Sequence, residues 1–417
     1  MIMSTPKQIT YNTAGTIVTL FCQWMILMII PKITAFSDAG VFAVALSICS
    51  ILNIVATFQL NQQQISDQYV RYTENDYRAV RSITITLSFV LCIFVVLFFN
   101  YTMEQNLVII FYMVYRNLLH YAYLYTATLQ IRGRLDHVGK CMMLEGAVSF
   151  ISFTASYYFT NDLVSSTLIM AVLGGGIFLA TVAHGYRKAV GRKYPRHRAD
   201  RSATSSLIKL GIPLLLSIIA PTIITALPRI ILQVTDGNEI VGIFGTLSTP
   251  TIVIPTLVLG IFTPFIVYFS NLCRRGDMMT LRRQYLKMAG LALILGVFGY
   301  ILSHFAAEPL FEMIYGDDIV PYVWSFKVIV MGITFYSVGM WGITVLITKE
   351  QGRCAAIASA ISLAIALAIF ITIIPKYHFD GAVFALVVAY GIFGIIVSLF
   401  VLIVPLRGTV TARNREV

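Results

Sequence analysis

The stretch from Leu107 to Leu129, LVIIFYMVYRNLLHYAYLYTATL, is an apolar and aromatic run of membrane length. At about 1.5 Å per residue, a helix of this length crosses a bilayer once. Arg116 lies near the middle of the run, and an arginine at the hydrocarbon midplane costs at least about 2.5–3.5 kcal/mol on insertion scales. His120 follows on the same helical face. We therefore expect the Arg116 side chain to lie in a protein interior or a water-filled cavity and to interact there with an anionic ligand.

The composition extends this interpretation to the whole chain. Of 417 residues, 58% are hydrophobic and 12% are charged, whereas a soluble globular protein averages about 45–50% apolar and about 25% charged residues. Apolar stretches of roughly 20 residues recur from end to end, so the chain is predicted to be an all-α polytopic membrane protein. The cysteines form no CxxC pair, and we interpret them as small apolar packing residues.

Twelve transmembrane spans are predicted, with boundaries soft by several residues. They run at residues 10–30, 40–60, 81–100, 106–129, 141–160, 164–186, 207–233, 240–269, 287–306, 320–347, 354–374 and 381–405. Most of the 30 Lys and Arg residues fall in every second connection, and the other connections favour acids. The positive-inside rule therefore places both termini in the cytoplasm. The net charge of +11 is explained by cytoplasmic anchors beside membrane lipids, so no nucleic-acid partner is expected.

The longest polar stretch lies midway along the chain. It runs from Arg187 to Ser206, and we interpret it as a cytoplasmic linker between two six-span halves. The alternative is that this basic stretch binds nucleic acid or acidic lipids. The predicted domains are an N-terminal six-helix lobe at 1–186, the basic linker at 187–206, a C-terminal six-helix lobe at 207–405 and a cytoplasmic tail at 406–417.

The two halves resemble one another in sequence. Pro31-Lys32 closes the first predicted span, and GVFAVALS at 40–47 opens the second. Pro228-Arg229 lies near the end of span seven, and GIFGTLS at 242–248 opens span eight. The shared order favours a duplicated half over chance. Six spans per half make the repeat parallel, an arrangement found in transporters whose substrate route lies between the halves.

Polar side chains recur at helical spacing in several spans, which places them on one face of each helix. The residues predicted to line a cavity are Asn12, Thr16 and Gln23 in span one, Asn53 and Thr57 in span two, and Ser217 and Thr225 in span seven. Hydrogen bonding between packed helices is the alternative for any one of them. Because the stripes occur in corresponding spans of a repeat that also holds buried cations, we favour a wet cavity.

Five side chains are predicted to bind an anionic substrate in that cavity. They are Arg116, His120, Arg229, Lys327 and Lys32. The alternative for Arg116 is capping of a broken helix or pairing across the bundle, and for the cations of spans seven and ten it is extension to the outer interface. Glu145 is predicted to lie too near the cytoplasm for Arg116 and to suit Arg132 or Arg134 better.

Prolines crowd spans seven and eight, and each interior proline permits a bend. The hinge candidates for alternating access are Pro221, Pro228, Pro250 and Pro255. The sequence has no Walker motif, no HExxH and no strand–turn–helix dinucleotide loop. We therefore expect no cofactor, no metal site and no transport driven by ATP within this chain. The predicted outer loops are too short for an external catalytic domain, so we do not expect an enzyme.

Four segments, in order, carry a resemblance to a known family. They are FSDAGVFAVALSICSILNIVATFQL at 36–60, LIKLGIPLLLSIIAPTIITALPRIIL at 207–232, EPLFEMIYGDDIVPYVW at 308–324 and IIPKYHFDGAVFALVVAY at 373–390. With these segments and twelve predicted spans, the chain resembles the polysaccharide flippases of the MOP exporter superfamily, the Wzx-like O-antigen and exopolysaccharide transporters. Pro228 stands where that family often has an aspartate before the arginine, so the chain departs from the family pattern there.

The resemblance implies two six-helix lobes that form a V around a central cavity. It also implies flipping of a polyprenyl-diphosphate-linked oligosaccharide from the cytoplasmic to the outer leaflet of the cell membrane, by alternating access. Expected partners are that lipid-linked glycan, membrane lipids, a polysaccharide polymerase and glycosyltransferases, and a coupling ion, H+ or Na+, is left open. The alternatives are a MATE-like drug or cation antiporter and, in a different class, a membrane glycosyltransferase or polymerase.

Overall fold

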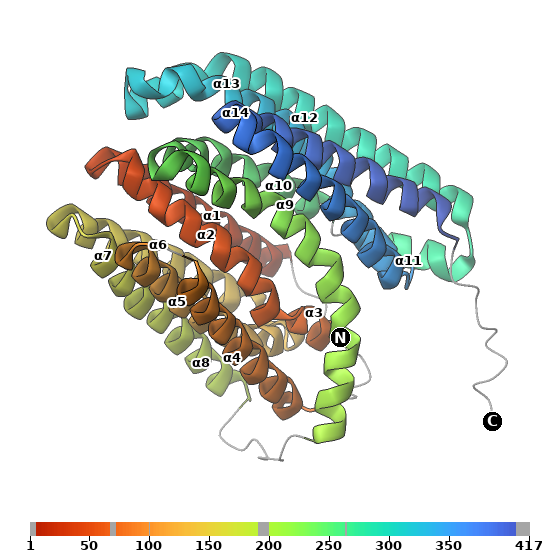
Figure 1. Cartoon of the computed structure of the whole chain (residues 1–417). Coiled ribbons are helices and arrows are strands. Elements are labelled where there is room, and N and C mark those ends of the chain that lie inside the picture. The colour runs from red at the N-terminus through yellow and green to blue at the C-terminus, as the bar shows by residue number, and fades with distance from the viewer. Residues whose placement is uncertain (1–5, 67–71, 100, 191–199, 263–264, 406–417) are drawn as a thin grey trace, which may run out of the picture. The chain divides into compact units, whose positions relative to one another are not determined.

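The structure is a computed structural model of the whole chain and describes residues 6–66, 72–99, 101–190, 200–262 and 265–405. Every regular element within these ranges is a helix (Figure 1), which confirms the predicted all-α class. Of the predicted cytoplasmic segments, the tail at 406–417 and residues 191–199 of the linker lie outside the described residues.

Three of the described helices of the first half begin at side chains that cap them. In the described residues the helices of this half are α1 (Pro6–Ile33), α2 (Phe36–Thr57), α3 (Leu60–Ser66), α4 (Glu74–Phe98), α5 (Met103–Ile131), α6 (Leu135–Thr160), α7 (Leu163–Met170), a π-helical segment (Ala171–Gly175) and α8 (Gly176–Val190). Thr73 and Thr102 start α4 and α5 with capping boxes, in which the threonine accepts from a backbone amide three residues on and that residue accepts from the threonine amide. Asp162 caps α7.

The second half has longer helices. Its described elements are α9 (Arg201–Ser248), a 3-10 segment (Thr249–Ile252), α10 (Val253–Phe262), α11 (Ile266–Arg275), α12 (Met278–Tyr315), a 3-10 segment (Asp317–Tyr322), α13 (Val323–Thr348) and α14 (Gly352–Ile403). Two of these helices contain a sharp change of direction. Gly237 in α9 has φ 83°, a left-handed value that glycine adopts easily, and His378 in α14 has φ 52°.

Ten helices in the described ranges are long and apolar enough to cross a membrane. Two of them run through the breaks described above: Arg201–Phe262 has 62 residues and Gly352–Ile403 has 52. A single crossing needs about 20 residues, so each of these two accommodates two of the predicted spans. The structure is thus compatible with about twelve crossings, and the prediction of a polytopic helical membrane protein is confirmed.

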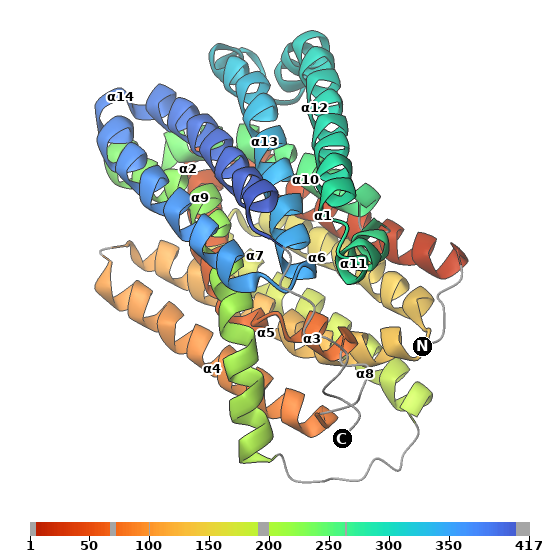
Figure 2. The ribbon, with the colours of Figure 1, turned by 90° about the vertical axis from the view of Figure 1, so that its right-hand side faces the viewer.

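The chain divides into two compact units. Unit 1 holds Met1–Leu215 with Gly237–Gly245, and unit 2 holds Leu216–Asp236 with Thr246–Val417. The first turns of α9 pack with unit 1, where Leu207 shares an apolar cluster with Leu60 of α3 and Tyr77 of α4 (Figures 1 and 2). The predicted boundaries of two six-helix lobes stay a prediction.

Glycines bring the backbones of α1 and α6 into contact within unit 1. A Cβ atom added at Gly15 would lie 2.6 Å from the carbonyl oxygen of Gly139, and one added at Gly139 would lie 2.2 Å from that of Tyr11. Small residues allow this approach because no side chain separates the two backbones, a common device in membrane helix pairs.

The two glycine motifs of the inferred repeat also meet in unit 1. A Cβ atom at Gly40 would lie 1.7 Å from the carbonyl oxygen of Asn238, and one at Gly242 would lie 3.0 Å from the amide nitrogen of Gly40. Gln105 of α5 adds a hydrogen bond of 2.9 Å from Nε2 to Oδ1 of Asn238. The segment 237–245, from the second half of the sequence, therefore completes the packing of α2 and α5.

Unit 2 has its own core. Trp341 of α13 is fully buried and packs edge-on against Phe262 and Phe269, with ring centroids 5.2 and 5.5 Å apart. Large apolar side chains are exposed on the middle of α12, where Phe298 is 65% exposed and Phe305 is 74% exposed. Large exposed apolar faces of this kind suit contact with lipid.

Candidate functional site

Arg116 lies in the middle of α5, half-buried inside unit 1. It interacts electrostatically with Tyr112, Tyr115 and Tyr123 of its own helix and with Glu145 of α6. Among the described residues, no carboxylate lies within ion-pair distance of its guanidinium, and its Nε has no hydrogen-bond partner. The predicted central cation thus sits in a membrane helix among tyrosines, with one acid near it.

The predicted depth of Glu145 was wrong. Helix α6 begins at Leu135, six residues earlier than the predicted start of the span at 141, and this places Glu145 more than a turn deeper. Its carboxylate accepts hydrogen bonds from the hydroxyls of Tyr115, of Ser149 at 3.2 Å and of Thr19 at 3.4 Å. Glu145 is therefore buried beside Tyr115 and Arg116, where α1, α5 and α6 meet.

The two cations expected to suit Glu145 are engaged elsewhere. Arg132 donates to the carbonyl oxygen of Ala189 at 2.8 Å, and Arg134 lies 3.6 Å from the carboxylate of Asp136. The first contact joins the turn after α5 to the last turn of α8, and the second lies at the start of α6. Arg132 and Arg134 therefore make contacts at the ends of the helices, whereas Glu145 makes its contacts in the interior of unit 1.

His120 and Asn53, which were both predicted from sequence, are brought together. His120 Nε2 lies 3.0 Å from Asn53 Oδ1, and both side chains are buried. Since an amide oxygen only accepts, the imidazole donates through Nε2. Its Nδ1 is buried with no partner in the part of the chain that the structure describes. This bond joins α2 to α5 one turn below Arg116.

Arg81 of α4 was not singled out from the sequence as a site residue. Its guanidinium is buried and donates to the carbonyl oxygens of Ala56 at 2.7 Å and Thr57 at 2.9 Å, and to Asn61 Oδ1 at 2.6 Å. It thereby satisfies the last carbonyls of α2, which have no partner within the helix. The polar run after Thr57 could have revealed this role, because it indicates that a helix ends there and that its last carbonyls need a donor from elsewhere in the chain.

Arg229 in unit 2 is buried, and its guanidinium has partners within that unit. One terminal nitrogen donates to Ser248 Oγ at 2.8 Å and to Thr249 Oγ1 at 3.1 Å. These hydroxyls stand where α9 gives way to the 3-10 segment. Arg229 therefore ties the arm of α9 before Gly237 to the end of the arm after it. Arg229 also interacts electrostatically with Tyr390 of α14.

The other two predicted cations are more accessible. Lys327 of α13 pairs with Glu308 of α12, with Nζ 3.7 Å from Oε2, and Lys32 is exposed at the end of α1. Lys327 belongs to unit 2, and Lys32 lies in the last turn of α1, in unit 1. Their role in binding substrate stays a prediction.

Three of the seven polar stripe residues donate a hydrogen bond to a carbonyl of their own helix. Thr16 donates to the carbonyl of Asn12 at 3.1 Å, Thr57 to that of Ile54 at 3.1 Å and Thr225 to that of Thr222 at 2.7 Å. The Ser217 side chain is buried, its carbonyl oxygen accepts from Ser359 at 3.0 Å, and Gln23 is half-buried. These bonds leave the wet cavity as a prediction.

The four hinge prolines occupy different settings. Pro221 and Pro228 lie within α9, whose one interior departure from helical geometry is Gly237. Pro250 lies in the 3-10 segment that follows α9, and Pro255 lies in the first turn of α10. Only the second pair coincides with a change of helix type, and hinge motion at any of them stays a prediction.

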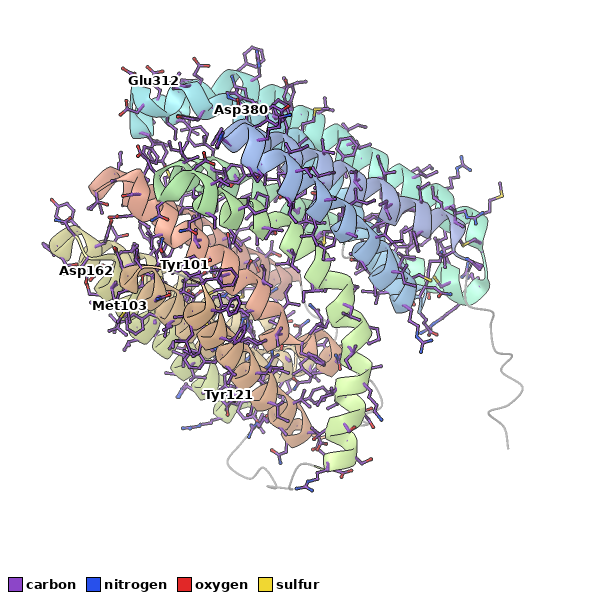
Figure 3. All side chains as sticks on the ribbon, viewed as in Figure 1. Tyr101, Met103, Tyr121, Asp162, Glu312 and Asp380 are labelled. Atoms are coloured by element: carbon purple, nitrogen blue, oxygen red, sulfur yellow. The ribbon has the colours of Figure 1, made fainter. Side chains whose placement is uncertain are left out.

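Three cavities open on the surface of unit 1. One, of about 390 Å³, lies between α4 and α5 and is lined by Phe89, Asn117, Leu118 and Tyr121 among others (Tyr121 is labelled in Figure 3). The other two, of about 330 and 320 Å³, lie between α1 and α6. Arg116 lines none of the three. In the described ranges, no three His, Cys, Asp or Glu side chains are placed to hold a metal ion.

The sequence matches the family described as polysaccharide biosynthesis protein over residues 6–272, more than half of the chain. The chain belongs to this family. A curated relative, the capsular polysaccharide biosynthesis protein CapF of Staphylococcus aureus, is 22% identical over 390 residues, which cover 92% of this chain and 96% of that protein. The predicted membership in the polysaccharide flippases of the MOP superfamily is confirmed.

Solved MATE and MOP transporters share the fold. A mutant of the Vibrio cholerae MATE transporter VcmN superposes with TM-score 0.67 at 14% identity, covering 94% of each chain. A MOP superfamily transporter of Pyrococcus furiosus, described by the reversed polarity of its binding pocket, superposes with TM-score 0.62 at 14% identity, covering 95% of this chain and 94% of that one. Family and fold are thus those of multi-pass membrane transporters in polysaccharide biosynthesis, not of enzymes.

Proposed function

We propose that this protein flips a polyprenyl-diphosphate-linked oligosaccharide from the cytoplasmic to the outer leaflet of the cell membrane by alternating access. Membership in a polysaccharide biosynthesis family supports a glycan as cargo, and the capsular relative supports a surface polysaccharide as its destination. Both termini are then cytoplasmic. Glycosyltransferases act before the transport step, and a polymerase acts after it. H+ or Na+ is the coupling ion to be tested.

The observation that carries the proposal is Arg116. A cation in a membrane helix with no ion pair among the described residues is costly to keep, unless its charge is used. A diphosphate offers several charged acceptors, and each hydrogen bond to it is stronger where water is scarce. The neighbouring Tyr112 and Tyr123 add hydroxyls that can reach the same group or the first sugar.

The test is transport in Arg116→Ala and Arg116→Lys variants. A charged hydrogen bond contributes about 1.5–3 kcal/mol, so we expect Arg116→Ala to lose tenfold or more of the surface polysaccharide made by a host that lacks its own flippase. Arg116→Lys keeps the charge but not the planar fork and should retain part of the activity. Lys209→Ala, which removes an exposed cation on α9, is the matched control. Full activity of a normally inserted Arg116→Ala protein would exclude this role.

One observation favours a second function, MATE-like cation antiport. Glu145 is a buried carboxylate in a membrane span, a group that can exchange a proton or sodium ion for a cationic drug. The two functions separate by variant. In an antiporter, Glu145→Gln abolishes drug efflux while Arg116→Ala retains it; in a flippase, Arg116→Ala abolishes export of the glycan, and neither variant alters drug resistance.

A further inference from the structure

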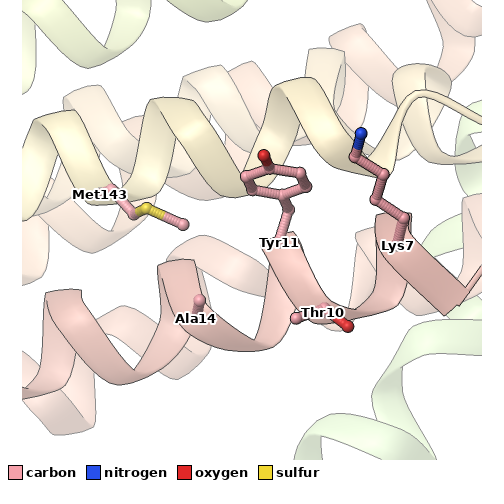
Figure 4. Close-up of a pocket in the computed structure, with 5 residues that line it drawn as sticks. All are labelled: Lys7, Thr10, Tyr11, Ala14 and Met143. Atoms are coloured by element: carbon pink, nitrogen blue, oxygen red, sulfur yellow. The ribbon is translucent and has the colours of Figure 1, made fainter.

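Two neighbouring cavities between α1 and α6 form one amphipathic site. The first is lined by Lys7, Gln8, Tyr11, Arg134, Asp136 and Lys140, and the second by Lys7, Thr10, Tyr11, Ala14 and Met143 (Figure 4). They share Lys7 and Tyr11, so the polar cavity adjoins the more apolar one. We call the two together the α1–α6 pocket.

The charges of the polar cavity are unbalanced. Its lining has three cations, Lys7, Arg134 and Lys140, against one acid, Asp136. That acid lies 3.6 Å from Arg134, which leaves the two lysines without an ion pair in the described part of the chain. Lys140 Nζ lies 5.1 Å from the centroid of the Tyr11 ring, so the ring holds one ammonium group over the shared wall.

The backbone keeps this arrangement in place. The α1 and α6 backbones touch at Tyr11 and Gly139, next to Lys140. Gln8 Nε2 donates to the carbonyl oxygen of Gly133, which has φ 68° in the turn between α5 and α6. The lysines of two helices thus face one hollow on a fixed framework, and are not scattered over a surface.

The position along the helices identifies the class of ligand. Lys7 lies in the first turn of α1, at the end of a helix that is long and apolar enough to cross a membrane, and Ala14 and Met143 lie further along α1 and α6. Lipid phosphates lie at the end of such a helix, with hydrocarbon on one side of them. Basic pockets between membrane helices at this level bind anionic headgroups. A free phosphate would use only the polar cavity.

We propose that the α1–α6 pocket binds a phosphate-bearing lipid. Lys7 and Lys140 bind the phosphate, and the first part of the hydrocarbon chain lies over Ala14 and Met143. The proposal stands apart from the proposed function, because the lipid can be a membrane phospholipid as well as a polyprenyl diphosphate. If the lipid is a membrane phospholipid, the pocket is a site for a structural or regulatory lipid. If it is a polyprenyl diphosphate, the pocket is a loading site for cargo.

The test is native mass spectrometry of the full chain in detergent. The probes are phosphatidylglycerol, polyprenyl diphosphate and inorganic pyrophosphate. Each lysine near a lipid phosphate contributes about 1 kcal/mol, so the double variant Lys7→Gln/Lys140→Gln should bind its lipid roughly 30-fold more weakly. The control Lys209→Gln/Lys287→Gln removes two exposed cations from α9 and α12 and should bind as the wild type does. Equal affinities in the two double variants would overturn the proposal.

A third variant separates lipid from free phosphate. Met143→Trp fills the apolar cavity and leaves both lysines in place. We expect it to weaken binding of the lipid about tenfold or more and to leave pyrophosphate unaffected. If pyrophosphate binds the wild type as tightly as either lipid does, the hydrocarbon chain contributes nothing and the proposal fails. A response to phosphatidylglycerol alone, or to polyprenyl diphosphate alone, supports it and identifies the lipid.

Discussion

Three arginines in the membrane helices differ in what their guanidinium groups touch. Arg81 donates to two carbonyls and an amide oxygen, and Arg229 donates to two hydroxyls, so each is bound to fixed acceptors of its own unit. Arg116 lies among tyrosine rings with Glu145 beyond ion-pair distance. The first two stabilise helix ends and turns. The third has no such set of fixed acceptors, and its proposed role is to bind an anionic ligand.

Arg81 is therefore expected to be a stability residue. Arg81→Ala leaves the last carbonyls of α2 without a donor in a buried region and should lower the free energy of unfolding by roughly 2–5 kcal/mol. Thermal unfolding of the detergent-solubilised protein, followed by intrinsic fluorescence, measures this as a lower apparent Tm. Lys209→Ala is the control, and a variant Tm equal to the control's would show that Arg81 is dispensable.

Sequence alone singled out Arg116, His120 and Asn53 as polar side chains within apolar runs, because a charge or amide there is visible without a structure, and their role in binding stays a prediction. It could not pair Glu145 with Tyr115, since that contact depends on where α6 begins. Nor could it show that Arg81, at the edge of a predicted span, turns inward to cap α2. A linear pattern fixes the depth of a side chain only to within the error of the helix boundary.

At the scale of single helices, small residues decide which pairs approach closely. The α1–α6 contact depends on Gly139, because any Cβ there would strike the backbone of Tyr11, which cannot rotate away. The helix periodicity predicted both helices but not their pairing. Pairing required the positions of Gly15 and Gly139 to fall opposite one another, and two stretches more than 100 residues apart do not reveal that register.

Gly139→Ala should therefore destabilise unit 1. Forcing a methyl group into this contact costs about 1–3 kcal/mol, because the two helices must separate. Gly290→Ala on α12 is the matched control: its Cβ meets open space, and alanine is the better helix former by about 1 kcal/mol. Apparent Tm values should fall for the first variant and hold or rise for the second. The opposite order would contradict the packing described here.

The ends of α13 and α14 predict a pH dependence. Lys349 follows α13, and its Nζ donates to the carbonyl oxygens of Val401 at 3.0 Å and Val404 at 2.6 Å. Burial lowers the pKa of Lys349 to about 8, from an ordinary value of about 10.4. Between these two pH values the unfolded chain binds a proton that the folded protein has released. Stability should therefore rise with pH from about 8 to about 10.4 and gain nothing from this group below pH 8.

Thermal unfolding across this window tests the expectation by comparison with Lys349→Met. The variant lacks the titrating group, so its apparent Tm should rise less steeply with pH than that of the wild type, although its Tm at pH 7.5 also changes through the lost hydrogen bonds. Parallel curves for the two proteins would show that Lys349 does not titrate in this range.

At the scale of the whole molecule, the distribution of charge predicts orientation. We expect both termini and the basic connections to face the cytoplasm, because cationic loops resist translocation. Fluorescent-protein and alkaline-phosphatase fusions measure this. A fluorescent protein fused after Val417 should fold and fluoresce, and a phosphatase fused after Asp162, at the turn before α7, should be active. An active phosphatase at Val417 would reverse the predicted topology.

Composition and apolar runs were enough to predict an all-α polytopic membrane protein, because the bilayer restricts the chain to helices of membrane length. They did not predict that segment 237–245 packs in unit 1. That arrangement arises from two glycines, Gly40 and Gly242, which let the two repeat motifs touch. The repeat was inferred from the sequence, whereas the contact between its two motifs depends on three-dimensional register.

This contact has a consequence for the protein divided into two chains. If the chain is cut between residues 191 and 199, the C-terminal piece carries 200–215 and 237–245, both of which belong to unit 1. The N-terminal piece alone would lack the partner of Gly40 and the acceptor of the Gln105 hydrogen bond. The two pieces should therefore reassemble when co-expressed, and neither should be recovered as an independent lobe. Unit 1 is thus assembled from both pieces of the divided chain.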